Sequence, residues 1–384
     1  MSWGWTPMSL TAIVACAPHV PPPMTLVKPD WRSVTTFLDS AVAAGAAPGA
    51  VLGVSVAGRR FVYATGQLGA DERSPATPST LYDIASVTKV VGLTTAVMLA
   101  VDEGKLDLDA RVQLYVPEFA GEGKERVTSR MLLAHVAGMP PWRPLFRETR
   151  SRAEAFALAN QTPLRSPPLS GEIYSDLGLI VITQAIEASY GARLDSMLLR
   201  RVFQPLGMAS TVFNPSAAVR SGTAPTELDP WRGRVLRGEV HDQNAARLDG
   251  VSGHAGLFAS ASDLLTFAEW MLAVWHGREV DGGPTVSPST VQEFTRRQDL
   301  VPGSSRAIGW DTPSPGGSAG SLLSPRSFGH LGFTGTSLWI EPERQLAVVL
   351  LSNRVNPTRD NPRWNPVRSA LADLVVTTLF EDAR

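Results

Sequence analysis

The chain has 384 residues, a formal net charge of -1 and 43% hydrophobic residues. This composition describes a globular protein of one or two domains, and the lack of a basic excess argues against nucleic-acid binding. Cys16 is the only cysteine, so the chain cannot form an internal disulfide. We expect no transmembrane span, because Lys89 interrupts the longest apolar run.

Residues 1–29 read as a leader or a disordered extension. A short apolar run ends at Cys16 and resembles a bacterial lipoprotein cleavage site, which would anchor the protein to the cell envelope. No lysine or arginine precedes Cys16, although a secretory signal normally carries positive charge there. We therefore favour a cytoplasmic protein that starts at Met24, with the envelope lipoprotein as the alternative.

A helix followed by a hairpin is predicted next. From Asp30, apolar residues recur at helical spacing until Pro48 ends the pattern. Residues 50–56 and 61–65 then read as two strands joined by a turn at Gly58. This order predicts helices packed on an antiparallel sheet.

The stretch 83–93 carries the main chemical signal. Ser86 stands three residues before Lys89, in an apolar run that continues to Val101 and ends before Gly104. Positions i and i+3 share one face of a helix, so Lys89 should lie beneath the Ser86 hydroxyl. Burial in an apolar helix should lower the pKa of Lys89, which could then take the serine proton. The helix N-terminus would add amide donors for an oxyanion.

A simpler interpretation is that Ser86 caps a core helix while Lys89 reaches solvent. The lysine count favours the chemical interpretation, because a chain with few lysines offers few chance matches to S-x-x-K. The four lysines are Lys28, Lys89, Lys105 and Lys124.

Residues 107–264 show mostly helical patterns with proline-rich connections. We expect His135 to be a structural group on a short helix over 131–137, and Trp142, in the following loop, to wall a pocket. Tyr174 precedes an apolar helix, at a junction where side chains can point into a cleft. A tyrosine near a lysine can relay protons. Taken alone, however, the pattern favours a capping turn, with Ser175 or Asp176 as the N-cap and Tyr174 as a packing residue.

Two further groups of residues invite chemical interpretation. His241, Asp242 and His254 could ligate a metal, but their spacing matches no zinc pattern, so we favour a structured loop near the site. Ser318 fits G-x-S-x-G, yet a nucleophile elbow needs a strand before the serine and a helix after it, and Ser318 lies in a Gly/Ser-rich loop. We predict neither a metal nor another cofactor.

The C-terminal part should complete the sheet. A hairpin pattern covers 328–340 and 346–352, with a turn at Pro342. The other expected elements are helices over 262–275 and 287–297, a short strand over 308–310 and a closing helix over 367–380.

Three sequence elements stand in one order, Ser86-x-x-Lys89, Tyr174-Ser175-Asp176 and His330-Leu331-Gly332. This order resembles the serine β-lactamase and penicillin-binding-protein superfamily, nearest the class C β-lactamases, D-alanyl-D-alanine carboxypeptidases and family VIII esterases. The resemblance implies an α+β fold, in which an antiparallel sheet is flanked by helices and carries an inserted, mostly helical domain. Residues 30–106 and 265–384 would form the sheet domain and 107–264 the insertion.

The resemblance also implies roles for individual residues. Ser86 would be acylated, with Lys89 as its base and Tyr174 passing the proton to the leaving group. The backbone N–H groups of Ser86 and Phe333 would form the oxyanion hole. Substrate would contact His330 and Gly332, which match the K-T-G strand, together with Asp176 and Trp142.

Three departures from the family pattern bear on the substrate. His330 replaces the lysine of K-T-G, Leu331 replaces its threonine, and Asp176 stands in place of asparagine. Together they weaken recognition of a penicillin carboxylate, so an uncharged ester or amide is the expected small-molecule substrate.

The expected protein is thus a metal-independent serine hydrolase, with ester hydrolysis as the favoured activity. Hydrolysis of β-lactams or D-Ala-D-Ala peptides is the first alternative. A penicillin- or peptide-binding module that turns over slowly or never is the second. A metallohydrolase built on His241 and His254 is the third.

Overall fold

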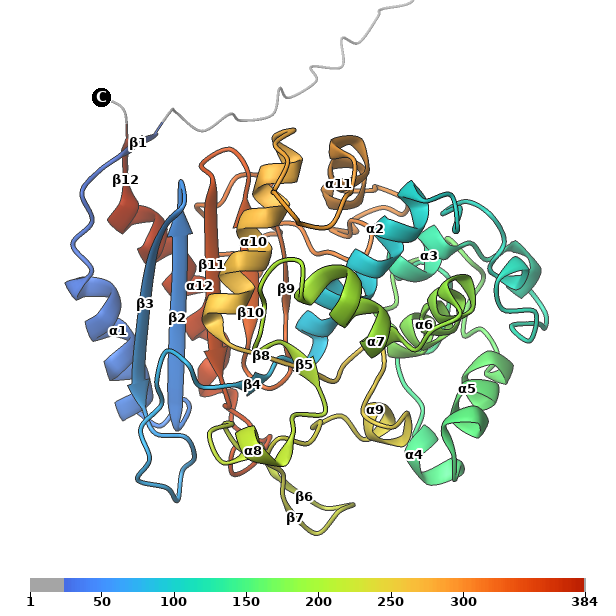
Figure 1. Ribbon diagram of the computed structural model, residues 1–384, viewed down its shortest axis with the longest axis horizontal. Helices are drawn as coiled ribbons and strands as arrows, with labels where there is room; N and C mark the ends of the chain where they lie inside the picture. The colour runs from blue at the N-terminus through green and yellow to red at the C-terminus, as the bar shows by residue number, and fades with distance from the viewer. Residues whose placement is uncertain (1–23, 383–384) are drawn as a thin grey trace, which may run out of the picture.

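The computed structural model describes residues 24–382. A five-stranded antiparallel sheet lies on one side of the molecule, on the left in Figure 1. Its strands are β2 (Gly49–Val56), β3 (Arg59–Gly66), β9 (Phe328–Leu331), β10 (Ser337–Glu341) and β11 (Leu346–Ser352). The order β3-β2-β11-β10-β9 places a hairpin from the start of the chain beside strands from its end. Strands β2 and β11 pair directly, from Ala50 opposite Ser352 to Val56 opposite Leu346.

The sequence of the sheet explains its shape. Ala57 and Gly58 adopt φ angles of 47° and 77° in the β2–β3 turn, the left-handed conformation that a two-residue hairpin needs. Alternate side chains of β11 enter two different apolar clusters, with Val349 in one and Val348 in the other. Because both faces are covered, β11 is apolar from Leu346 to Leu351.

Helices cover the two faces of the sheet. On one face lie α1 (Arg32–Ala43) and α12 (Asn365–Leu379), and on the other lies α10 (Ala261–Trp275), as Figure 1 shows. Trp31, before α1, stacks on Phe61 of β3 with ring centroids 4.0 Å apart. The α+β fold with a helix-flanked antiparallel sheet is therefore confirmed.

Part of the predicted leader is ordered. Strand β1 (Met24–Leu26) pairs antiparallel with β12 (Phe380–Asp382), so residues near the two ends of the chain meet. The proposed lipidation site, Cys16, lies outside the described residues.

Between the hairpin and α10, the chain forms mostly short helices, as the pattern indicated. It also forms the small strands β4 (Tyr82–Asp83), β5 (Val212–Phe213), β6 (Leu228–Asp229), β7 (Arg234–Val235) and β8 (Leu257–Ala259). The division of the chain into a sheet domain and an inserted domain over 107–264 stays a proposal. The helices are α3 (Ser129–Leu133), α4 (Leu145–Glu148), α5 (Arg152–Gln161), α6 (Asp176–Tyr190), α7 (Leu194–Leu198), α8 (Ala217–Arg220) and α9 (Gln243–Arg247), and α11 (Pro288–Thr295) follows α10.

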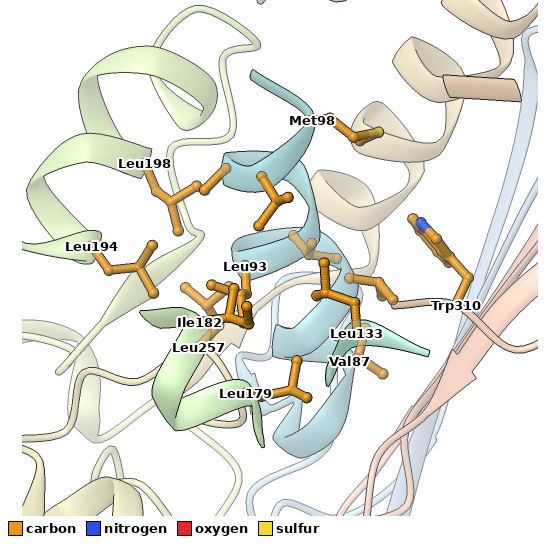
Figure 2. Packing of buried hydrophobic residues seen from close by; sticks show 14 of the residues in the cluster. Val87, Leu93, Met98, Leu133, Leu179, Ile182, Leu194, Leu198, Leu257 and Trp310 are labelled. Atoms are coloured by element: carbon orange, nitrogen blue, oxygen red, sulfur yellow. The ribbon is translucent and has the colours of Figure 1, made fainter. Parts of the chain in front are cut away.

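The segment Ala85–Asp102 is one continuous helical stretch through the core (Figure 2). It begins as a 3₁₀ turn, continues as a π-helix over Lys89–Thr94 and ends as α2 (Thr95–Asp102). Lys89 therefore does not interrupt it, and by length and composition alone its 18 residues could span a membrane. Because 83% of the segment is buried inside the protein, we interpret it as a core helix.

Two local predictions are wrong, the helix over 131–137 and the strand over 308–310. In both, the backbone turns where the pattern indicated a continuous element. Helix α3 ends at Leu133, and His135 follows it with a left-handed φ of 59°. Residues 308–310 form no strand. Gly309 turns the chain with φ 80°, and a Cβ there would lie 2.0 Å from Thr94 Oγ1.

Candidate active site

The turn that carries Ser86 is held from two sides. Asp83, at the end of β4, accepts a 2.8 Å hydrogen bond from the N–H of Ala85, whose φ is 47°. Thr336, from the loop between β9 and β10, donates to the carbonyl oxygen of Ile84 at 2.9 Å. Ala85, directly before Ser86, is thus held in its left-handed conformation by these hydrogen bonds. Such a strained conformation persists only where the surrounding structure fixes it.

Lys89 lies fully buried, three residues after Ser86. Its Nζ is 2.9 Å from Ser86 Oγ, 2.8 Å from the carbonyl oxygen of His254 and 2.7 Å from Asp176 Oδ1. The first two contacts are hydrogen bonds, and the third is an ion pair that does not have hydrogen-bond geometry. The expected Ser86–Lys89 contact is present, and Lys89 does not reach solvent.

The predicted direction of the Lys89 pKa shift is wrong. Burial does act to lower this pKa, but the interactions with Asp176 and Tyr174 outweigh it, and the net shift is upward. The resting site therefore holds an ammonium group beside a carboxylate. Lys89 must release a proton before it can accept one from Ser86.

Tyr174 stands beside this pair. Lys89 Nζ lies 5.1 Å from the centre of the tyrosine ring, which also packs against His135 and His330, with ring centroids 4.5 and 6.1 Å away. Burial raises the pKa of Tyr174, although Lys89 opposes the shift. The group is a phenol at neutral pH and can donate a proton.

The start of α6 places Tyr174 and Asp176. Ser175 is the N-cap of α6, so the capping interpretation holds together with the position beside Lys89. The N–H of Asp176 donates to the carbonyl oxygen of Pro141 at 3.0 Å, directly before Trp142. Trp142 is 47% exposed, and its role as a pocket wall stays a prediction.

His135 is a neighbour of the site that the sequence did not reveal. Its Nδ1 accepts the N–H of Ser175 at 3.1 Å, which holds the residue between Tyr174 and Asp176. Burial and the charge of Arg306 keep the pKa of His135 well below its ordinary value. The contact depends on the left-handed backbone of His135, which no local pattern indicated.

His330 lies buried on β9 and is neutral. Its Nδ1 donates to the carbonyl oxygen of Leu331 at 2.7 Å. Burial, helped by the charges of Lys89 and Arg306, lowers the pKa of His330 to about 3. At neutral pH it therefore cannot pair with a carboxylate as a K-T-G lysine would.

Gly332 lets the end of β9 approach the Ser86 turn. A Cβ on Gly332 would lie 2.4 Å from the carbonyl oxygen of Ile84 and 2.0 Å from Thr336 Oγ1. No side chain fits there without a backbone shift. The peptide that joins Gly332 to Phe333 therefore lies close to the turn of Ser86, as an oxyanion hole built from both residues requires.

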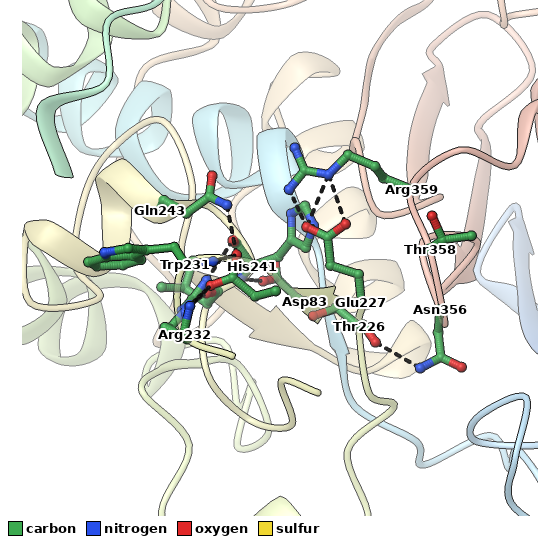
Figure 3. Close-up of polar contacts among 12 residues, drawn as sticks. Asp83, Thr226, Glu227, Trp231, Arg232, His241, Gln243, Asn356, Thr358 and Arg359 are labelled. Atoms are coloured by element: carbon green, nitrogen blue, oxygen red, sulfur yellow. Dashed lines mark hydrogen bonds and ion pairs between the residues drawn. The ribbon is translucent and has the colours of Figure 1, made fainter. Parts of the chain in front are cut away.

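A polar cluster around His241 holds Asp83, the residue whose carboxylate fixes the turn before Ser86 (Figure 3). The N–H of His241 donates to Asp83 Oδ2 at 2.7 Å, and its ring bonds Glu227 at 2.9 Å. Arg359 also donates to Glu227, at 2.8 Å. His241 stacks on Phe333 with ring centroids 5.6 Å apart, so the cluster links the segment before α9 to the loop between β9 and β10.

His254 belongs to a separate cluster. Its ring contacts Asp242 at 2.9 Å and Ser252 at 2.7 Å, while His241 pairs with Glu227. Throughout residues 24–382, no three His, Cys, Asp or Glu side chains are grouped as metal ligands. Ser252 is fully buried, so the Ser–His–Asp contact chain offers no accessible nucleophile. It is the His254 carbonyl that contacts Lys89, a backbone contact that no side-chain pattern can predict.

Comparisons with known proteins agree with this fold. The β-lactamase family profile matches residues 34–373. A Salmonella agona (strain SL483) protein named "Putative D-alanyl-D-alanine carboxypeptidase" is 33% identical over 328 residues, covering 76% of this chain and 73% of the relative.

Solved structures share the fold at lower identity. A penicillin-binding protein homologue from Caulobacter crescentus has a TM-score of 0.73 at 20% identity, covering 93% of this chain and 100% of that chain. EstCE1, described as a hydrolase with promiscuous acyltransferase activity, has a TM-score of 0.69 at 22% identity, covering 88% and 97%. A β-lactamase from Sulfitobacter sp. EE-36 has a TM-score of 0.71 at 20% identity, covering 91% and 100%. The chain belongs to the β-lactamase family of serine hydrolases.

Proposed function

We propose that this protein hydrolyses uncharged esters through an acyl-enzyme on Ser86. The observation that carries the proposal is the 2.9 Å contact between Ser86 Oγ and a buried Lys89, which also contacts Asp176 at 2.7 Å. A nucleophile that contacts a base, with the base oriented by a third group, is the arrangement that activates a hydroxyl.

In the acylation step, Lys89 acts as the free amine, which forms when its ammonium group loses a proton to solvent. Ser86 Oγ then attacks the carbonyl carbon of the ester while its own proton moves to Lys89. The N–H groups of Ser86 and Phe333 stabilise the tetrahedral oxyanion. When the bond to the leaving oxygen breaks, Tyr174 protonates that oxygen and regains a proton from Lys89.

Deacylation repeats these roles with water. A water molecule attacks the acyl carbon, its proton is taken up by the Tyr174–Lys89 pair, and the bond to Ser86 Oγ breaks. Ser86 recovers a proton and the acid product leaves. Because Lys89 serves in both half-reactions, no glutamate base is needed.

The charges of the site favour an uncharged substrate. His330 is neutral at neutral pH because its pKa is lowered to about 3, so it offers no cation to a substrate carboxylate. Asp176 adds a negative charge that repels one. Both features support a neutral ester over a penicillin.

A second candidate function is hydrolysis of D-Ala-D-Ala peptides or β-lactams. The observation in its favour is the name of the 33% identical Salmonella relative. A module that binds such ligands without turnover is a further alternative, and the close approach of Ser86, Lys89 and Tyr174 argues against it.

Parallel assays with three substrates test the proposal. We expect p-nitrophenyl butyrate to be hydrolysed with a kcat/KM at least about tenfold above those for nitrocefin and for a diacetyl-Lys-D-Ala-D-Ala peptide. Faster turnover of nitrocefin or of the peptide would replace the esterase assignment with the corresponding second candidate. Binding of benzylpenicillin without turnover of any substrate would identify a binding module.

We expect the substitution Asp176→Asn to shift the acid limb of the pH profile downward. Asp176 helps to raise the pKa of Lys89, and only the free amine of Lys89 can accept the Ser86 proton, so activity rises with pH through that pKa. Loss of the carboxylate should lower this pKa and move the acid limb of log kcat/KM down by about 1–3 units. Asp39→Asn, on α1, is the control and should leave the profile in place. An unmoved limb in Asp176→Asn would show that Asp176 does not set the Lys89 pKa.

A further inference from the structure

The N–H of Phe333 belongs to the same peptide unit as the carbonyl of Gly332. Arg368, on α12, donates from Nη2 to that carbonyl oxygen at 2.6 Å. The arginine thus contacts the back of the peptide whose N–H would face the oxyanion. Hydrogen bonding at a carbonyl oxygen polarises the whole amide and makes its N–H a stronger donor.

Arg368 carries a charge that no acid offsets. Its side chain is buried, and burial together with the nearby Arg354 lowers its pKa to about 10, with no carboxylate acting in the opposite direction. It therefore stays protonated at neutral pH. Its Nε has no hydrogen-bond partner within residues 24–382, while its Nη2 donates to the Gly332 carbonyl.

The loop itself is fixed by other bonds. Thr336 Oγ1 donates to the Ile84 carbonyl at 2.9 Å, and Trp364 Nε1 donates to the Gly335 carbonyl at 2.7 Å. Ser352 Oγ donates to the same Gly335 carbonyl at 3.2 Å. Burying a cation without a counter-charge costs desolvation free energy, and a neutral donor could make the same contact with the loop without that cost.

We propose that Arg368 is a positioning residue that polarises the Gly332–Phe333 peptide and so strengthens the oxyanion hole. This inference rests on the proposed acyl-enzyme chemistry of Ser86. Negative charge develops on the carbonyl oxygen only during the reaction, so the contribution of Arg368 belongs to the transition state. It should appear in kcat and leave substrate binding nearly unchanged.

Three variants separate charge from loop geometry. Arg368→Met removes both the charge and the donor, Arg368→Lys keeps the charge, and Ser352→Ala removes a different bond to the same loop. Each is measured for kcat and KM with p-nitrophenyl butyrate, for the thermal midpoint, and for affinity towards butylboronic acid. In the boronate adduct, Ser86 Oγ bonds to boron, its proton moves to the free-amine form of Lys89, and a negative tetrahedral boron places an oxygen in the oxyanion hole.

We expect Arg368→Met to lose about tenfold in kcat and about tenfold in boronate affinity with KM nearly unchanged, less than the loss of a whole oxyanion donor. Arg368→Lys should recover part of both, and Ser352→Ala should keep both. The proposal is overturned if a folded Arg368→Met keeps kcat and boronate affinity within twofold, or if Ser352→Ala loses as much. Where Arg368→Met does not fold, Arg368→Gln serves instead, as a neutral donor that should show the same loss if charge matters. Activity that survives in Ser86→Ala would instead refute the acyl-enzyme chemistry itself.

Discussion

Ser86→Ala should lower kcat/KM for p-nitrophenyl butyrate by at least about 10⁴-fold, because no other group can form the acyl-enzyme. The substitution removes one hydroxyl from a turn whose backbone is fixed by Asp83 and Thr336, so the fold should persist. Steady-state kinetics and a thermal midpoint within a few degrees of wild type would together show that chemistry, and not folding, is lost.

The matched control for this variant is Ser318→Ala. Ser318 carries the competing G-x-S-x-G motif, but the structure places it in an irregular loop between α11 and β9, without the strand and helix of a nucleophile elbow. We expect full activity in Ser318→Ala. The reverse pattern, with activity lost only in Ser318→Ala, would move the nucleophile to the loop.

Lys89→Met should lower kcat/KM by about 10³-fold, the scale of a missing general base. Methionine fills similar space in the apolar helix but can neither accept the Ser86 proton nor pair with Asp176. The pH profile of the residual activity should lose its acid limb, because that limb reports Lys89. Kinetics between pH 5 and 10 provide the measurement.

Lys124→Met is the matched control for Lys89→Met. Lys124 is the other buried lysine, lying 4.8 Å from the centre of the Phe119 ring and donating to the Asn160 carbonyl. Its loss should cost stability without reducing kcat/KM by more than about twofold. Equal losses of activity in the two methionine variants would mean that burial of a lysine, and not its contact with Ser86, supports the reaction.

The main elements of the fold could be predicted because their signals are local. The hairpin of β2 and β3 follows from apolar runs around a Gly turn, and the core helix after Ser86 follows from the mostly apolar run that continues to Val101. The Ser86–Lys89 contact is local too, since helical geometry brings positions i and i+3 together. For Tyr174 and Asp176 the local pattern indicated only a loop-to-helix junction, and their roles beside Ser86 were implied by the family pattern.

What sequence could not predict depends on residues that meet only in the fold. The upward shift of the Lys89 pKa comes from Asp176, 87 positions away, which overrides the burial that the helix pattern indicated. His135 reaches Ser175 only because its backbone is left-handed. Arg368 contacts Gly332 from the closing helix, whose amphipathic pattern marks no charge as special.

The central claim is that Ser86 is the nucleophile, and labelling with an alkyl fluorophosphonate tests it most directly. An activated serine breaks the P–F bond, forms an Oγ–P bond and releases HF, so the product is stable and can be located by peptide mass spectrometry. We predict that wild type gains one phosphonyl group on the peptide containing Ser86, that Ser86→Ala gains none, and that esterase activity falls in step with labelling. Labelling at another residue, or full activity in a protein that takes up no label, would contradict the claim.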